Sequence, residues 1–283
     1  MPYTFKRKPE WLRKKINFTI NKELETILEQ HNINTVCQEA MCPNISECFA
    51  QKQATFLIMG TECTRRCTFC AVDKGSPKPL DADEPQNIAN SVKVMGLKHV
   101  VITSPTRDDL EDGGAEHFCK TVQAIKGLEN KVVIELLIPD MQGKEELIKE
   151  VANCGADIIG HNLETIPRLY HIRKGSSYER SLDVLKMLKE FNPNVATKSA
   201  IMLGLGEKRG EVLELMQNLL DVECRYLSIG QYLQPTQKHE NIVNYVEPSE
   251  FETLKISGLD MGFRYIQSSP YTRSSYMAHQ YLE

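Results

Sequence analysis

The sequence predicts an α/β fold, a partial (β/α)6 barrel of the TIM type with N-terminal and C-terminal extensions that cover the barrel mouth. From residue 55 onward, short and almost continuously apolar runs alternate with helical patterns, which is typical of a parallel sheet covered by helices. Six such units are too few for a complete eight-stranded barrel, and the length of 283 residues suits one domain of this kind.

The apolar runs predict six strands, at residues 55–59, 99–103, 132–138, 158–161, 196–205 and 226–233. The helical patterns between them predict helices at residues 87–95, 115–125, 144–153, 178–191 and 211–220. Right-handed crossovers bring the carboxyl end of every strand to one face of the barrel, so we expect the functional residues there.

The chain is expected to divide into an N-terminal extension at 1–52, the barrel at 53–262 and a C-terminal tail at 263–283. Within the extension, residues 21–28 predict a helix with Asn21 as its N-cap. Pro43 and Asn44 then indicate a loop. The tail carries one further candidate strand, followed by a polar and aromatic stretch that would fold back over the barrel mouth.

The net charge of −4 gives no indication of a nucleic-acid partner. A basic run near the start is either a docking surface for an acidic partner or a solvated arm; it consists of Lys6, Arg7, Lys8, Arg13, Lys14 and Lys15. The first ten residues lack the apolar segment of a signal peptide, and no apolar run is long enough to span a membrane. We therefore expect a soluble, cytoplasmic protein without a membrane partner, whose clustered cysteines are metal ligands or catalytic groups.

Six of the nine cysteines form two closely spaced triads. The first triad is Cys37, Cys42 and Cys48, spaced C-x4-C-x5-C, and the second triad is Cys63, Cys67 and Cys70, spaced C-x3-C-x2-C. Three thiolates can bind three irons of a cubic iron–sulfur cluster and leave the fourth iron open, whereas clusters that only carry electrons usually have four cysteine ligands. Zinc would require four ligands, usually in C-x2-C pairs, and the second triad does not match that pattern.

The segment 60–70, Gly-Thr-Glu-Cys-Thr-Arg-Arg-Cys-Thr-Phe-Cys, resembles the signature of the radical S-adenosylmethionine (SAM) superfamily. The resemblance implies that the second triad holds a 4Fe-4S cluster whose open iron binds the amino and carboxylate groups of SAM. Electron transfer from the cluster would cleave SAM to methionine and a 5′-deoxyadenosyl radical. The open iron then corresponds to the vacant position that catalytic metals retain.

The first triad lies in the context Cys-Pro-Asn-Ile-Ser-Glu-Cys at 42–48, which resembles the auxiliary-cluster motif of the lipoyl synthase family. Similar matches occur along nearly the whole chain, at 7–13, 107–115, 161–165, 204–207, 229–235 and 273–278. The resemblance implies a second 4Fe-4S cluster, the auxiliary cluster, on the first triad. Its fourth ligand would be a serine oxygen from the closing motif, and Ser275 is favoured over the adjacent Ser274.

Candidate SAM contacts follow from the same comparison and from strand positions. The stretch Asp112, Gly113 and Gly114 resembles the part of the superfamily that meets the amino group of SAM, although a plain turn would have the same composition. Asn162 and Glu164 end the fourth expected strand and should point to the same face. Lys198, at the start of the fifth, is a weaker candidate.

The resemblance implies that an octanoyl group on a lysine of a lipoyl carrier domain is converted to lipoyl, with sulfur taken from the auxiliary cluster. The implied partners are octanoylated lipoyl domains of 2-oxoacid dehydrogenase acyltransferases, the glycine-cleavage carrier protein, a reductant such as flavodoxin or ferredoxin, and an iron–sulfur carrier protein. The alternatives are another sulfur-inserting radical SAM enzyme, such as a biotin-synthase-like or methylthiotransferase-like one, or a non-enzymatic iron–sulfur or zinc module.

Overall fold

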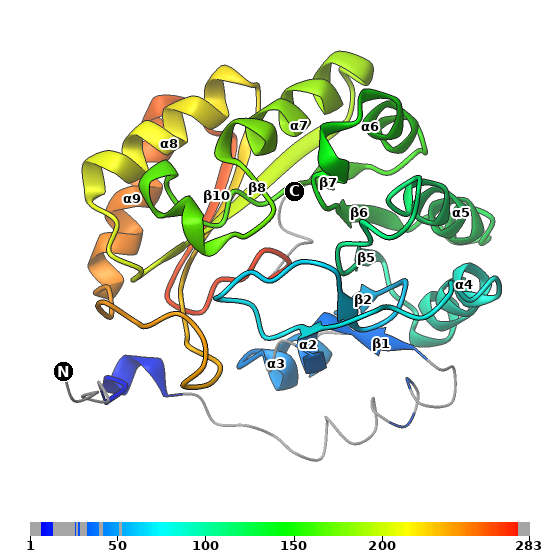
Figure 1. Ribbon diagram of the computed structural model, residues 1–283, viewed down its shortest axis with the longest axis horizontal. Helices are drawn as coiled ribbons and strands as arrows, with labels where there is room; N and C mark the ends of the chain where they lie inside the picture. The colour runs from blue at the N-terminus through cyan, green and yellow to red at the C-terminus, as the bar shows by residue number, and fades with distance from the viewer. Residues whose placement is uncertain are drawn as a thin grey trace.

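The strands of the main sheet lie side by side in the same order in which they occur along the chain (Figure 1). The computed structural model describes residues 7–13, 26, 28, 33–39, 42–50 and 53–276. Within these residues the sheet consists of β1 (Asn34–Thr35), β2 (Thr55–Leu57), β5 (His99–Thr103), β6 (Val133–Leu137), β7 (Ile158–Gly160), β8 (Ala196–Leu203), β9 (Tyr226–Gln231) and β10 (Tyr265–Ser268).

All neighbouring strands from β2 to β10 pair in parallel, and β1 alone pairs antiparallel, with β2. The sheet therefore curves from one edge at β1 to another at β10, which confirms the expected partial barrel. It has one more parallel strand than the six that were expected, because β10 at the start of the expected tail joins the sheet beside β9.

Helices cover the outer face of the curved sheet (Figure 1). They are α4 (Glu84–Met95), α5 (Ala115–Lys126), α6 (Glu145–Ala152), α7 (Tyr178–Phe191), α8 (Arg209–Asp221) and α9 (Pro248–Met261). Fully buried strand residues such as Ile102, Ile134 and Leu136 form one apolar cluster with helix residues such as Phe118 and Leu185. This packing explains why the strand sequences are nearly continuous runs of apolar residues.

The sequence patterns did not predict α9. The helix contains Gly258, where an added Cβ would lie 2.2 Å from Cδ1 of Ile266 in β10, so close packing against the last strand requires a residue without a side chain. Its boundaries do carry recognisable signals, because Pro248 begins the helix and Gly262 follows it in the left-handed conformation, with φ of 116°.

The interior of the barrel contains a buried ion pair. Nζ of Lys198 on β8 lies 2.7 Å from Oε1 of Glu135 on β6, and both side chains are only 1% exposed. His99 on β5 approaches the same carboxylate, with its Nε2 3.5 Å from Oε2 of Glu135. Charges this deeply buried are tolerated only when they are paired, so these three residues bind the interior faces of three strands together.

The N-terminal extension contributes the short helices α2 (Val36–Glu39) and α3 (Ile45–Ala50) beside β1 and β2. The helix expected at 21–28, including its N-cap Asn21, lies outside the described residues except for Thr26 and Leu28. Lys6, Lys14 and Lys15 of the basic run lie outside them as well.

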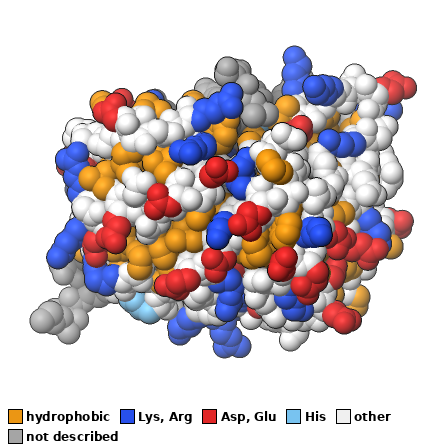
Figure 2. Space-filling model, turned by 90° about the horizontal axis from the view of Figure 1, so that it is seen from above, with side chains coloured by type: hydrophobic (Ala, Val, Ile, Leu, Met, Phe, Trp, Pro, Cys, Tyr) orange, Lys and Arg blue, Asp and Glu red, His pale blue; other side chains and the backbone are white. Residues whose placement is uncertain are grey.

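The outer surface carries charges of both signs. On the face that Figure 2 shows, Lys and Arg side chains are interspersed with Asp and Glu, and apolar side chains lie between them. Among the described helices, none combines the length and the apolar character needed to cross a bilayer.

Candidate active site

The second triad follows β2 at the carboxyl-terminal end of the sheet, with Cys63 in the short strand β3 (Glu62–Cys63) and with Cys67 and Cys70 in the loop after it. Cys63, Cys67 and Cys70 all line one pocket of about 810 Å³, which we call the second-triad pocket. Asn162 and Glu164, which follow β7, line the same pocket. The structure therefore brings these two predicted residues together with the three thiols.

Local backbone features shape this loop. Met59 and Gly60 have positive φ angles, 65° and 88°, so the chain turns sharply where β2 ends. The amide of Thr64 then donates to the carbonyl of Thr106 at 3.0 Å, and the amide of Thr68 donates to that of Ile172 at 2.8 Å. These bonds attach the loop to segments that follow β5 and β7.

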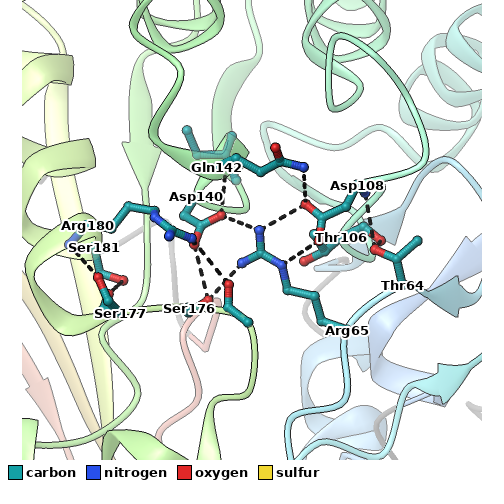
Figure 3. A network of polar contacts seen from close by, with 12 residues as sticks. Thr64, Arg65, Thr106, Asp108, Asp140, Gln142, Ser176, Ser177, Arg180 and Ser181 are labelled. Atoms are coloured by element: carbon teal, nitrogen blue, oxygen red, sulfur yellow. Dashed lines mark hydrogen bonds and ion pairs between the residues drawn. The ribbon is translucent and has the colours of Figure 1, made fainter.

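Arg65, between Cys63 and Cys67, fastens the same loop from within (Figure 3). Its guanidinium donates to Asp108 from Nε at 2.8 Å, to Asp140 from Nη2 at 2.6 Å, and to Ser176 from Nη1 at 2.8 Å. These partners come from three separate loops, and Arg65 is only 8% exposed. A buried guanidinium with several fixed partners holds its position well, so the loop has a defined shape before any metal binds.

Arg65, Asp108 and Asp140 keep their charges at neutral pH. Burial alone would raise the pKa of Asp140, but the hydrogen bond and charge of Arg65 outweigh it and hold that pKa well below its usual range. The pKa of Asp108 is lowered for the same reason, again against the effect of burial. Both carboxylates are therefore ionised at neutral pH, and Arg65 remains paired.

Three of the six triad thiols, those of Cys37, Cys67 and Cys70, lie in surroundings that disfavour the free thiolate. Burial raises the pKa of Cys67 to about 11, although the nearby Arg173 lowers it in part. Burial likewise raises the pKa of Cys37 to about 11 and that of Cys70 above its ordinary value. Without a cation these three thiols stay protonated at neutral pH, so iron binding would have to displace their protons.

The first triad lines a pocket of its own, about 440 Å³ in volume, which we call the first-triad pocket. The cysteines lie on α2, on the connection to α3 and on α3 itself, so short helices flank the loop that Pro43 predicted. Ser275 and Arg273 from the C-terminal tail line the same pocket. Residues from near both ends of the chain therefore meet around these three thiols.

Direct hydrogen bonds join the tail to the N-terminal extension. Nδ2 of Asn44 donates to the carbonyl of Tyr271 at 2.6 Å, and the hydroxyl of Tyr276 donates to Oε1 of Glu47 at 2.9 Å. Asn44 is 1% exposed, so its bond is shielded from water. The tail thus folds back over the barrel mouth, as the sequence led us to expect.

The two adjacent serines of the tail face different surroundings. Ser275 lines the first-triad pocket, and its Oγ accepts a hydrogen bond from Oγ1 of Thr55 at 2.7 Å. Ser274 is absent from that lining, and its Oγ donates to Oδ1 of Asn162 at 3.0 Å. Of the two, Ser275 therefore has the position that a ligand of the first triad would need.

A third pocket, about 960 Å³ in volume, lies between the other two, and we call it the central pocket. Cys37 and Cys42 border it on one side, and Asn162 and Glu164, which also line the second-triad pocket, border it on the other. Apolar side chains form much of the remaining wall, including Leu137, Ala200, Ile201 and Met202. The central pocket is therefore bordered directly by the first triad and adjoins the second-triad pocket through Asn162 and Glu164.

Glu164 is held in an unusual conformation at this junction. Its φ is 67°, which is rare for a residue with a side chain, and its Oε1 accepts a hydrogen bond from Nδ2 of Asn162 at 3.0 Å. Burial raises the pKa of Glu164, while the charge of Arg173 opposes this. A strained backbone next to a buried carboxyl group is typical of a binding site.

Both triads fit a cluster better than a single ion. Among the described residues, no three His, Cys, Asp or Glu side chains are close enough together to share one metal ion. The ligands of a cubic cluster bind different irons and therefore stand further apart. Each of the two triads places three thiols around one pocket, and three thiols are a donor set suited to an iron–sulfur cluster.

Comparison with known proteins supports this chemistry. The profile of the Radical SAM superfamily matches residues 57–219. Lipoyl synthase from Geotalea uraniireducens (strain Rf4) is 53% identical over 275 residues, 97% of this chain and 97% of the relative. Lipoyl synthase from Geobacter sp. (strain M21) is 51% identical over 277 residues, 98% of this chain and 95% of the relative.

This chain belongs to the lipoyl synthase family. Solved structures of other radical SAM enzymes have the same fold at much lower sequence identity. Methylornithine synthase (PylB) has a TM-score of 0.59 at 18% identity, over 75% of this chain and 63% of that protein. The FeFe-hydrogenase maturase HydG from Carboxydothermus hydrogenoformans has a TM-score of 0.60 at 14% identity, over 76% of this chain and 53% of that protein.

Four residues predicted to contact SAM do not line the pockets of this lipoyl synthase family member. Asp112 instead caps α5, because its carboxylate accepts from the amides of Gly114 and Glu116, both at 3.0 Å. An added Cβ on Gly114 would lie 2.3 Å from Sδ of Met59, so this glycine serves close packing. Gly113 lies just before α5 and has a φ of 56°. Lys198 forms an ion pair with Glu135 in the barrel interior. We leave these four out of the proposed site.

Sequence reasoning also missed residues that the lipoyl synthase fold brings to the pockets. They are Thr55, Arg65, Asp140, Arg173 and Arg273. Arg65 could have been found, since a charged residue between two ligands of one loop has to find a partner nearby. Thr55 lies between the two triads in the sequence, whereas Asp140, Arg173 and Arg273 come from distant parts of the chain and are related to the triads only by the fold.

Proposed function

We propose that this chain converts an octanoyl group, attached to a lysine of a lipoyl carrier domain, into a lipoyl group by inserting two sulfur atoms. The proposal rests mainly on the central pocket, which Cys37 and Cys42 of the first triad border and which shares Asn162 and Glu164 with the second-triad pocket. A substrate there would have access to hydrogen abstraction from one side and to a sulfur source from the other. Membership of the lipoyl synthase family supports the same reaction.

The second triad would hold one 4Fe-4S cluster, and the first triad with Ser275 would hold another. When bound, these clusters supply the electron that cleaves SAM and the sulfur that is inserted. The serine oxygen is a harder donor than thiolate and suits iron less well. It would therefore be the ligand that is released most easily when the auxiliary cluster gives up sulfur.

The protein would bind and orient the two substrates. Asn162 and Glu164 offer an amide and a carboxyl group to the polar end of SAM, and Arg173 adds a cation to the same pocket. The wall formed by Leu137, Ala200 and Met202 would surround the acyl chain and exclude water. Holding both reactants in fixed positions protects the reaction from side products.

The proposed reaction replaces two C–H bonds by two C–S bonds. Each replacement consumes one SAM and one electron, and the hydrogen lost from carbon leaves in 5′-deoxyadenosine together with free methionine. A low-potential donor such as flavodoxin or ferredoxin would supply the electrons.

The test is incubation of anaerobically prepared protein with SAM, a reductant and an octanoylated lipoyl-domain peptide. We expect the peptide mass to increase by two sulfur atoms, because the reductant keeps the product as the dithiol, and to fall by two hydrogens when air then oxidises it to the disulfide. About eight irons per chain should be present, as two cubic clusters require. Zinc without sulfide, or a peptide of unchanged mass, would rule the proposal out.

Single substitutions separate the two clusters. Cys67→Ala is expected to abolish SAM cleavage, since it removes a ligand of the SAM-binding cluster. Cys42→Ala should leave SAM cleavage measurable as 5′-deoxyadenosine but should stop sulfur insertion. Cys154→Ala, a cysteine outside the three pockets, is the control and should retain both activities. Lipoyl product from the Cys42→Ala protein would contradict the role of the first triad.

A further inference from the structure

Arg273 brings a positive charge to the first-triad pocket without a carboxylate to balance it. Its Nη1 donates to the carbonyl of Thr272 at 2.7 Å and to that of Pro270 at 3.5 Å. No ion pair in the described part of the chain includes Arg273. Its guanidinium is therefore satisfied only in part by backbone oxygens of its own segment.

The buried arginines Arg65 and Arg107 differ in this respect from Arg273, which is partly buried. Arg65 pairs with both Asp108 and Asp140, and Arg107, which is 2% exposed, pairs with Asp109 at 2.8 Å. A guanidinium that is removed from bulk water normally has such a partner. The pocket that Arg273 lines contains three cysteines instead.

The position of Arg273 is set by the backbone around it. Gly230 on β9 allows the tail to approach so closely that an added Cβ would lie 2.0 Å from the carbonyl oxygen of Thr272. Thr272 is 1% exposed, and the carbonyl of Tyr271 is held by Asn44 at 2.6 Å. The cation is thus fixed beside the thiols rather than carried on a loose surface chain.

We propose that Arg273 is the counter-charge of the auxiliary cluster, which it retains in the pocket and makes easier to reduce. The inference rests on the proposed function, because it requires a cluster on the first triad. A cubic cluster with thiolate and serine oxygen ligands carries net negative charge, and net charge is one of the factors that set its reduction potential. A fixed cation beside it stabilises the reduced, more negative form.

The test uses a parent protein in which Cys63, Cys67 and Cys70 are all replaced by alanine, so that only the auxiliary cluster can form. Arg273→Gln and Arg273→Lys are made in this parent, and the midpoint potential is measured by a spectroscopic redox titration together with iron and sulfide content. Arg264→Gln, which removes an exposed positive charge far from the lining of the pocket, is the control.

We expect Arg273→Gln to shift the midpoint potential to a more negative value, while Arg273→Lys and Arg264→Gln stay close to the parent. If Arg273→Gln instead loses its iron, Arg273→Lys must restore it. An unchanged potential and iron content in Arg273→Gln, or loss of iron in both Arg273 variants, would overturn the inference. A parent that holds no iron or sulfide at all would instead contradict the auxiliary cluster of the proposed function, and this inference with it.

Discussion

At the scale of single residues, the most informative contrast is between the neighbours Ser274 and Ser275. One backbone step separates a hydroxyl that faces the first triad from a hydroxyl that hydrogen-bonds Asn162 near the second. The two serines are the central residues of a turn, which the amide of Tyr276 closes by donating to the carbonyl of Arg273 at 3.0 Å, and their side chains face different pockets. This arrangement makes the two serines a matched pair for mutagenesis.

We predict that Ser275→Ala lowers the auxiliary iron content and reduces lipoyl formation at least tenfold, because the cluster loses its fourth protein ligand. Ser274→Ala removes one neutral hydrogen bond, worth about 1 kcal/mol, so product formation should fall about fivefold or less. Iron analysis and product mass measure both effects. If Ser274→Ala rather than Ser275→Ala lost iron, the assignment of the ligand would be reversed.

At the scale of secondary structure elements, β9 and the tail depend on each other through Gly230. The glycine lies opposite Met202 of β8 in the sheet, and the carbonyl of Thr272 occupies the space that a side chain would fill. Close backbone approach of this kind is a recognised reason for glycine within a strand.

We predict that Gly230→Ala displaces the tail and thereby Arg273 and Ser275. SAM cleavage should persist, while lipoyl formation falls at least tenfold and the iron content moves from about eight toward four per chain. Gly210→Ala in α8 is the control, because an added Cβ there has no atom within 4 Å. Equal lipoyl yields from the two variants would show that the position of the tail does not depend on the close packing of Thr272 against Gly230.

The elements themselves were largely predictable, and the exceptions have physical causes. The pattern for α7 matched its observed bounds, because its buried residues recur at helical spacing. The helix α9 was not predicted because Gly258 interrupts its apolar periodicity at the point where the helix contacts β10. The pairing of Lys198 with Glu135 could not be predicted, because the two residues are far apart in the chain and only the fold brings them together across the barrel.

The candidate site was predictable only where its residues are close in sequence. The second triad lies within eight residues and was identified from spacing, and Asn162 and Glu164 were identified from their position after a strand. Ser275 was found only through resemblance to a family. The same resemblance placed residues 273–278 near the first triad, but the approach of the Arg273 side chain to the thiols depends on how the tail crosses β9.

At the scale of the whole molecule, the barrel combines an apolar layer between the sheet and its helices with the buried ion pair of Lys198 and Glu135 on the inner side of the sheet. We predict that Lys198→Met lowers the free energy of unfolding by about 3–5 kcal/mol, because Glu135 would be left buried without its cation. Urea unfolding followed by circular dichroism measures the change. The double variant Lys198→Met/Glu135→Leu should recover most of the loss, and a double variant as unstable as the single one would exclude unpaired charge as the cause.

The tail contacts also determine when each half of the site can exist during synthesis. The second-triad cysteines lie within eight consecutive residues, and the hydrogen bonds that fix their loop reach as far as Glu240, whereas the bonds that close the first-triad pocket join residues 220, 227 and 229 positions apart and reach Tyr276. Translation proceeds at about 5–20 residues per second, so the first three cysteines emerge roughly ten seconds or more before their serine partner. A nascent chain therefore offers an incomplete auxiliary site until residues 271–276 have left the ribosome, and premature release would leave a protein able to form the SAM-binding site alone.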